Sequence, residues 1–203
     1  LNELDALANI DFATRTEKDE HRTLEIVRVG TCGGMQEDIP LGTFLVSEKS
    51  IGWDGVLAFY EGRDEIADLG FEDALVDFIH YPAKAARPYV VAANPELVNR
   101  IAGDDMMRGC TIAANGFYGP QGRVLRCDLA VKDINERITD FRYEGQRITN
   151  YEMEGSAIAG LSLLMGHKAM TVCCVIAQRK VEAANTDYKP RIKQLVQTVL
   201  ERI

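Results

Sequence analysis

Two carboxylates stand close together in the stretch Asn150-Tyr151-Glu152-Met153-Glu154-Gly155, just before a long apolar segment. The segment, residues 156–165, is nearly uncharged and rich in small and apolar residues. This pattern predicts a buried helix that ends at Gly166, because glycine is favoured just after the last turn of a helix. Carboxylates at the start of a buried helix require an explanation, either structural or chemical.

The spacing of the two acids favours a different role for each. Thr149 and Glu152 have the Ser/Thr-x-x-Glu spacing of a capping box, and the helix dipole stabilises acids in a first turn. If both acids are helical, Glu152 and Glu154 point roughly 200° apart, so they cannot act together as an acid and nucleophile pair on one substrate. We therefore expect Glu152 to cap the helix and Glu154 to face a ligand.

A second candidate site is the glycine-rich segment Arg28-Val29-Gly30-Thr31-Cys32-Gly33-Gly34, which follows a predicted strand. A turn made of these glycines could direct backbone N–H groups toward an anion, and Arg28 could bind two oxygens of the same anion. The spacing differs from the GxGxxG pattern of dinucleotide-binding folds. The segment therefore indicates either an anion site or an ordinary tight turn.

Two further segments carry polar side chains after predicted strands. Phe117, Gln121 and Arg123 lie in a glycine-rich loop, where an amide beside a guanidinium suits a planar ligand with both donors and acceptors. A surface loop with a solvated arginine is the alternative. Gln178-Arg179 follows a long apolar run, where a charge commonly marks the chain reaching solvent. If these segments meet Arg28 and Glu154 at one sheet edge, they form a cleft for phosphate, a hydroxylated ring and a planar base.

Alternating helices and strands are expected to position these residues. Helical spacing of apolar residues predicts helices over residues 1–10, 71–80, 96–102, 156–165 and 190–203. Short apolar segments predict strands over residues 24–29, 43–47, 110–114 and 169–177. This alternation indicates an α/β sandwich, in which ligands bind near the carboxyl ends of strands.

Composition narrows the class of protein. The chain has 203 residues, of which 46% are hydrophobic, so residues 1–203 are most simply one domain. A net charge of -8 argues against a nucleic-acid surface, and no apolar run is long enough to cross a membrane. The five cysteines form no CxxC pair and the three histidines are scattered, so no metal is expected, and the odd cysteine count suggests reduced thiols in the cytoplasm. The chain starts with leucine, so it is expected to begin partway through a longer protein.

Taken in order, three of these segments resemble the nucleoside phosphorylase family, within it the uridine phosphorylase branch. They are Arg28-Val29-Gly30-Thr31-Cys32-Gly33, Phe117-Tyr118-x-x-Gln121-x-Arg123 and Asn150-Tyr151-Glu152-Met153-Glu154. The resemblance implies a three-layer αβα sandwich with a central mixed sheet, running from the first helix to the last. The family's upstream Gly-Asp-Pro-Gly-Arg-type phosphate loop and its N-terminal strands have no counterpart here. The resemblance therefore implies an N-terminally incomplete fold, the C-terminal two-thirds of the family domain.

The resemblance also implies roles for individual residues. The implied binding residues are Arg28, Thr31, Cys32 and Gly33 in the phosphate motif, Glu152, Met153 and Glu154 in the ribose motif, and Phe117, Gln121, Arg123, Ile176 and Arg179 around the base. Among them, Arg123 and Gln121 would be catalytic, because they would stabilise the charge that develops on the departing base. Purine-directed relatives carry an aspartate where this chain has Ala177-Gln178-Arg179, so a pyrimidine is favoured.

The implied function is phosphorolysis of uridine to uracil and ribose 1-phosphate, a pentosyltransferase reaction of pyrimidine nucleoside salvage. No cofactor is expected, and inorganic phosphate is the co-substrate. The resemblance further implies a cytoplasmic homo-oligomer with shared active sites and no nucleic-acid or membrane partner. Two alternatives remain open from the sequence. One is a purine nucleoside phosphorylase or nucleosidase, and the other is a truncated, non-catalytic nucleoside-binding subunit.

Overall fold

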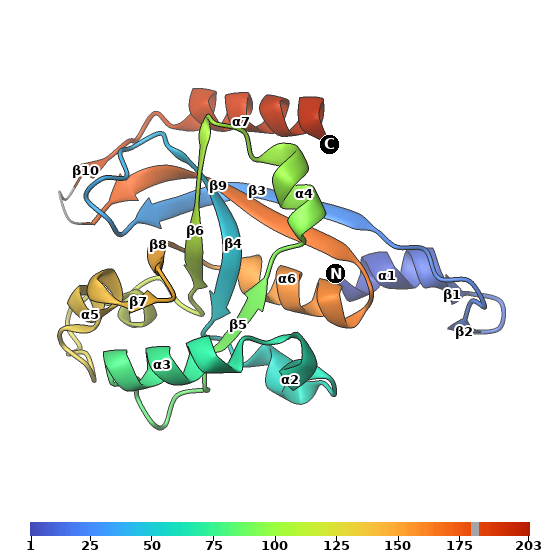
Figure 1. The fold of residues 1–203 in the computed structure, drawn as a ribbon, viewed down its shortest axis with the longest axis horizontal. Coiled ribbons are helices and arrows are strands. Elements are labelled where there is room, and N and C mark those ends of the chain that lie inside the picture. The colour runs from blue at the N-terminus through green and yellow to red at the C-terminus, as the bar shows by residue number, and fades with distance from the viewer. Residues whose placement is uncertain (180–182) are drawn as a thin grey trace.

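The computed structural model of the chain describes residues 1–179 and 183–203. A curled, mixed β-sheet forms its centre, with helices on both sides (Figure 1). Its strands are β3 (Glu25–Gly34), β4 (Phe44–Gly52), β5 (Tyr89–Ala92), β6 (Met106–Ala113), β8 (Gln146–Glu152), β9 (Lys168–Gln178) and β10 (Ala183–Ala184), in the spatial order β10-β9-β3-β8-β6-β4-β5. The short strand β7 (Arg142–Tyr143) pairs with β8. The prediction of an α/β fold with a central mixed sheet is confirmed.

The sheet curls because β4, near one end of the strand order, also pairs with β9, near the other end. It pairs in parallel with β6, and its first residues, Phe44–Val46, also pair antiparallel with Val172–Cys174 of β9. Strand β9 pairs in parallel with β3 along its whole length. Every residue from Ala169 to Val175 is buried, as expected for a strand that is covered on both faces. The apolar run at 169–177 is therefore correctly predicted as a buried strand.

Helices cover the sheet in two layers (Figure 1). The helices α4 (Pro95–Ile101) and α7 (Lys189–Arg202) pack on one side, where Leu97, Ile101 and Leu195 join a core cluster with Val172. The other side carries α2 (Arg63–Ile66), α3 (Leu69–Ile79), α5 (Ile134–Asp140) and α6 (Gly155–Leu164), with the short 3-10 helices η1 (Val56–Phe59) and η2 (Gly119–Gln121). Apolar packing on both sides fixes the position of the sheet, and therefore also the position of its strand ends.

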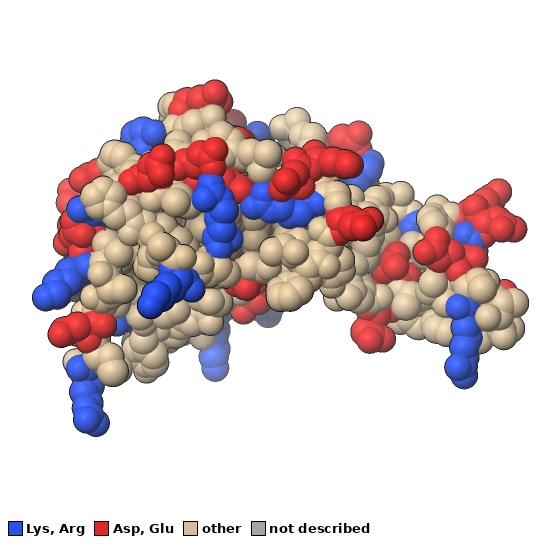
Figure 2. Space-filling model, turned by 90° about the horizontal axis from the view of Figure 1, so that it is seen from below, with Lys and Arg blue, Asp and Glu red and all other residues tan. Residues whose placement is uncertain are grey.

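A small arm projects from one end of the molecule (Figure 1). It consists of α1 (Asn2–Asn9) and a hairpin of β1 (Ile10–Asp11) and β2 (Thr16–Glu17). Buried His167 attaches the arm to the sheet, since its Nε2 lies 3.1 Å from Asp5 Oδ1 and its Nδ1 accepts a hydrogen bond from Leu24 N. Seen from the side of α2 and α3, Figure 2 shows acidic and basic side chains interspersed, with no continuous basic area on that face.

The predicted helices are confirmed, and local capping explains their ends. Asp68 accepts a hydrogen bond from Phe71 N at the start of α3, and Asn94 accepts one from Leu97 N at the start of α4. Gly166 has φ of 73°, the left-handed conformation that ends α6 as predicted. Short-range signals of this kind are readable from sequence because the partner lies within a few residues.

Two predicted local structures are wrong. Residues 30–34 are not a turn but the last part of β3, because their pairing with β9 continues through Gly34 with one register shift after Cys32. The capping box at Thr149 and Glu152 implies a helix start after Thr149, but residues 150–152 end β8 and α6 starts at Gly155. Strands β5 and β8 and helix α5 also lie outside the predicted elements. Residues 30–34 and strands β5 and β8 owe their conformation to pairing with strands that are distant in sequence.

Gly52 generates a test of the packing in this sheet. It pairs across strands with Tyr89, and a Cβ at Gly52 would lie 2.1 Å from the tyrosine ring. The buried ring is held because its hydroxyl bonds Asp54 and Ser156. We expect Gly52→Ala to lower the free energy of unfolding by about 1–3 kcal/mol in urea denaturation. Gly119→Ala, whose Cβ would meet nothing closer than 4.0 Å, is the control, and an equal loss in both variants would contradict this account.

Candidate active site

A single cavity of about 250 Å³ brings the three sequence motifs together. It opens where three strands end, because Gly33 of β3 pairs with both Tyr151 of β8 and Ala177 of β9. The lining residues are Arg28, Thr31, Cys32, Gly33, Phe117, Gln121, Arg123, Tyr151, Glu152, Met153, Glu154, Ile176 and Ala177. All of the predicted site residues except Arg179 are in this lining. Arg179 instead donates a hydrogen bond to Gln121, which is part of the lining.

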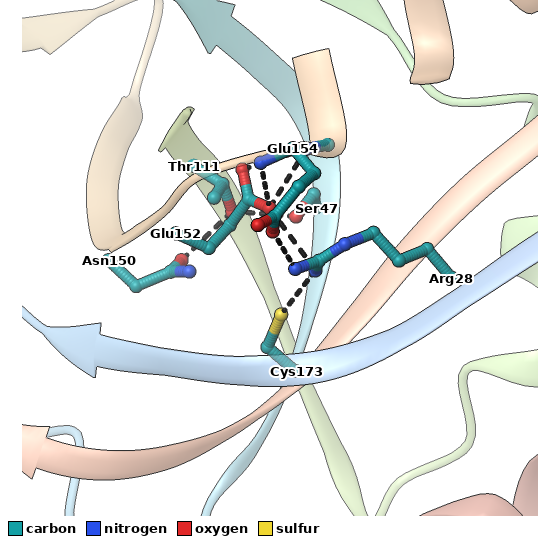
Figure 3. Close-up of polar contacts among 8 residues, drawn as sticks. Arg28, Ser47, Thr111, Asn150, Glu152, Glu154 and Cys173 are labelled. Atoms are coloured by element: carbon teal, nitrogen blue, oxygen red, sulfur yellow. Dashed lines mark hydrogen bonds and ion pairs between the residues drawn. The ribbon is translucent and has the colours of Figure 1, made fainter. Parts of the chain in front are cut away.

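Arg28 dominates one end of the cavity (Figure 3). Its Nη1 lies 3.1 Å from Glu152 Oε2 and donates a hydrogen bond to Cys173 Sγ at 3.3 Å. Its Nη2 donates to Glu154. Burial acts to lower the pKa of Arg28, but Cys173, Glu152 and Glu154 outweigh this and raise it. The guanidinium therefore stays charged, and it is surrounded by two carboxylates.

Glu152 has the capping role expected of it, but it performs that role from a strand. Its carboxylate accepts hydrogen bonds from the backbone N–H groups of Glu154 and Gly155, at the first turn of α6. Thr149 is not its capping partner, because the Thr149 hydroxyl donates to Cys110 O and to Asn150 Oδ1. Burial raises the pKa of Glu152, although the hydrogen bond from Glu154 N and the charge of Arg28 act in the opposite direction. The capping box predicted from spacing is wrong, while the anionic cap itself is present.

The opposite end of the cavity is built around buried Gln121. Its Oε1 accepts hydrogen bonds from Arg123 Nη1 and Arg179 Nη2, both at 2.7 Å. Arg179 Nη1 also donates to the backbone oxygen of Gln121 at 2.9 Å. Because two guanidinium groups hold Oε1, the amide is oriented with Nε2 as its donor toward a ligand. Arg179 is therefore not a solvated charge at the end of a strand, because its guanidinium is hydrogen-bonded to the loop that carries Gln121.

The two arginines of this end lie close enough to influence each other. Burial and the nearby charge of Arg123 lower the pKa of Arg179 to about 10. Arg123 stacks on Phe117, with Cζ 3.8 Å from the ring centroid, and Arg179 lies 4.7 Å above the ring of Tyr151. Two partly desolvated cations beside an amide donor favour a ligand that carries negative charge at this end.

Sequence reasoning missed several residues that shape the cavity. Tyr151 and Ala177 line it, and Asn135 supports the Gln121 loop by donating to the backbone oxygens of Gln121 and Gly122. The Tyr151 hydroxyl donates to Asn135 Oδ1. Tyr151 could have been named from the sequence, because it is the direct neighbour of Glu152 in the third motif. No sequence signal pointed to Asn135, because it lies in a polar segment away from all three motifs.

The chemistry available to these side chains is binding and electrostatic stabilisation. Cys32 lines the cavity, but burial and the adjacent Cys173 raise the pKa of its thiol well above the usual range, which keeps it protonated and a poor nucleophile. Within residues 1–179 and 183–203, no three histidine, cysteine or acidic side chains are grouped so that they could hold a metal ion. In the same residues, every helix is too short or too polar to cross a membrane.

The chain is similar in sequence to curated uridine phosphorylases. It is 24% identical over 155 residues to a uridine phosphorylase of Thermococcus kodakarensis, covering 75% of this chain and 48% of the relative. It is 28% identical over 161 residues to uridine phosphorylase A of Schistosoma mansoni, covering 75% of this chain and 47% of the relative. The chain thus spans about half the length of the curated relatives it matches.

Solved structures show the same fold. A Trypanosoma brucei nucleoside phosphorylase, described as showing uridine phosphorylase activity, matches with a TM-score of 0.80 at 23% identity, over 99% of this chain and 74% of that one. A Schistosoma mansoni uridine phosphorylase in complex with uracil matches with a TM-score of 0.60 at 24% identity, over 89% of this chain and 60% of that one. A model of the phosphorylase superfamily matches residues 8–202. Because that match covers nearly the whole chain, this protein belongs to the phosphorylase superfamily.

Proposed function

We propose that this chain forms the catalytic domain of a uridine phosphorylase, which converts uridine and inorganic phosphate to uracil and ribose 1-phosphate. The observation that carries the proposal is the Gln121–Arg123–Arg179 cluster, which faces the Arg28–Glu154 end across one cavity. The curated relatives named above, both uridine phosphorylases, support it. In this proposal residues 1–203 are one phosphorylase-like domain, with no cofactor beyond the co-substrate phosphate.

The reaction separates charge, and the cavity has the matching polarity. A phosphate oxygen forms a bond to C1′ of the ribose while the glycosidic bond breaks and its electron pair moves onto uracil. The sugar becomes cationic and the base anionic as the bond lengthens. Glu152 and Glu154 lie at the sugar end, while Arg123 and Arg179 lie at the base end. Groups already oriented toward developing charge lower the barrier without reorganising.

A pyrimidine is the base that this cavity favours. Gln121 presents an amide donor, and Arg123 presents a cation to a carbonyl oxygen that gains charge. At the end of β9, Arg179 lies against Gln121, so among the described residues this end of the cavity carries arginines rather than an acid that could protonate a purine ring. Ile176 and Phe117 supply apolar surface for a flat ring. The cavity of about 250 Å³ suits a small nucleoside base and its sugar.

We also propose that the active protein is a cytoplasmic homo-oligomer with shared sites. Arg28 already pairs with two carboxylates, so an incoming phosphate needs additional positive charge from outside this cavity. The loop that carries Gln121 and Arg123 also has the exposed apolar side chains of Phe117, Tyr118, Val124 and Leu125, which a second copy could cover. Free cysteines, including exposed Cys127, support a reducing compartment.

The direct experiment mixes the full-length protein with uridine and phosphate and follows the release of free uracil. Phosphate-dependent release is the expected result. Faster turnover of inosine than of uridine would instead identify a purine enzyme. Uridine binding in calorimetry without any phosphate-dependent turnover would identify a non-catalytic binding subunit. Size-exclusion chromatography with light scattering tests the oligomer, and a monomer with full activity would contradict shared sites.

Arg123→Ala is expected to lower kcat on the order of 10²-fold, because it removes a cation that stabilises the departing base. Its loop is partly exposed, so the midpoint of thermal unfolding should change little. Arg126→Ala is the matched control, since Arg126 is exposed three residues further along the chain. Steady-state kinetics with uridine provide the measurement. Full activity in Arg123→Ala would remove this residue from the catalytic machinery.

Glu154→Gln is expected to raise KM for uridine about tenfold, because a neutral amide accepts a weaker hydrogen bond from the ribose hydroxyls than a carboxylate does. KM for phosphate should stay the same or fall, since Arg28 loses one competing anion. Glu136→Gln, at an exposed position on α5, is the control. Initial rates at varied uridine and varied phosphate separate the two constants. A rise in KM for phosphate alone would contradict the ribose assignment.

A further inference from the structure

The two terminal nitrogens of Arg28 have different surroundings (Figure 3). Nη1 contacts Glu152 and Cys173, whose side chains are buried on strands β8 and β9. Nη2 contacts Glu154, whose side chain is 57% exposed at the cavity. One nitrogen is therefore anchored in the sheet, and the other faces the space where substrates bind.

Cys173 lies next to the guanidinium of Arg28. It pairs with Gly30 across the parallel strands β3 and β9, and a Cβ on Gly30 would lie 2.6 Å from Arg28 Nη1. The arginine side chain thus folds back over a glycine and reaches the cysteine beyond it. The Sγ of Cys173 accepts the hydrogen bond from Nη1 at 3.3 Å. Removing this sulfur would leave a gap beside the guanidinium of Arg28 and so loosen its packing against β9.

The contact restricts where Nη2 can point. A guanidinium is planar and rigid, so fixing Nη1 at two points also fixes the direction of Nη2. Glu152 alone would let the group rotate about a single ion pair. With Cys173 as the second point, Nη2 is directed to the position that Glu154 now occupies. A phosphate oxygen that replaces Glu154 there would find its donor already oriented.

We propose that Cys173 is a positioning residue for phosphate binding, which holds Arg28 through Nη1 so that Nη2 can exchange Glu154 for a phosphate oxygen. This inference rests on the function proposed above and deepens it. Cys173 does not touch the substrate, and it acts only through Arg28. The thiol lies in the middle of β9, five residues after Lys168, the first residue of the strand, where composition alone predicts a core residue.

The test uses the full-length protein with Cys173→Val and Cys173→Ser. Valine keeps the volume and removes the acceptor, while serine keeps an acceptor. We expect Cys173→Val to raise KM for phosphate roughly five- to tenfold, with KM for uridine within about twofold. Cys173→Ser should stay within about twofold of the unaltered protein for both substrates.

Cys174→Val is the matched control. Cys174 is the next residue of β9 and is equally buried, but it belongs to the core cluster with Leu195 on the α7 side. It should therefore leave KM for phosphate unchanged. If Cys174→Val gives the same rise as Cys173→Val, or if serine fails to restore phosphate binding in a folded protein, the positioning role is wrong. Circular dichroism melts identify any variant that has lost its fold.

A binding measurement separates this inference from the proposed function. Inorganic phosphate is titrated by calorimetry into the unaltered protein and each variant, without any nucleoside. If uridine is not turned over but phosphate binds and Cys173→Val weakens it, the proposed reaction is wrong and the positioning role stands. If the unaltered protein binds no phosphate, or if valine binds it as tightly as cysteine does, the positioning role is overturned.

Discussion

The buried carboxylate of Glu152 is the interaction on which the rest of the site depends. It accepts backbone hydrogen bonds at the start of α6 and pairs with Arg28, so one side chain joins β8, α6 and β3. Burying a carboxylate is costly unless it is paired and hydrogen-bonded, and Glu152 meets both conditions. The backbone N–H groups that it binds also fix where Glu154 begins the helix. The position of Glu154 at the cavity thus follows from the hydrogen bonds of its neighbour Glu152.

The other constraint is the parallel pairing of β3 with β9. It brings Gly33 beside Ala177, and the antiparallel pairing of β3 with β8 brings Gly33 beside Tyr151, so segments more than a hundred residues apart meet at one point. Because the strands run in the same direction, both of their carboxyl ends open into the cavity. Arg179 leaves β9 at that point and returns to Gln121. The Gln121–Arg179 end and the Arg28 end of the cavity are therefore built on the same strand pair.

The polarity of the cavity connects this architecture to the proposed chemistry. The carboxylates lie at one end and the paired arginines at the other, so charge separation in a nucleoside would be stabilised along one direction. Arg28 lies among the carboxylates rather than among the arginines. Its charge is already compensated there, so in the proposed reaction phosphate binding would depend on further cations and on accurate placement of this guanidinium.

Much of the molecule could be predicted from the sequence alone. The helices were readable because apolar spacing, Asp68, Asn94 and Gly166 act within a few residues of the structure they determine. The buried strand at 169–177 was readable from its unbroken apolar run. The order of the three motifs indicated the superfamily, which the match over residues 8–202 established. Glu152 caps α6 and Glu154 lies at the cavity as expected, but Glu152 also lines the cavity and both acids contact Arg28, so the expected separation of the two acids is wrong.

Only the tertiary structure decided what the glycines and the strand ends do. Residues 30–34 resembled a turn because glycines lack a side-chain pattern, and their strand conformation comes from hydrogen bonds to β9, distant in sequence. Arg179 resembled an exposed charge until the fold placed Gln121 against it. Cys173 resembled core until Arg28 was seen to reach it over Gly30. Sequence determines local propensity and residue chemistry, whereas long-range pairing determines which of those residues meet.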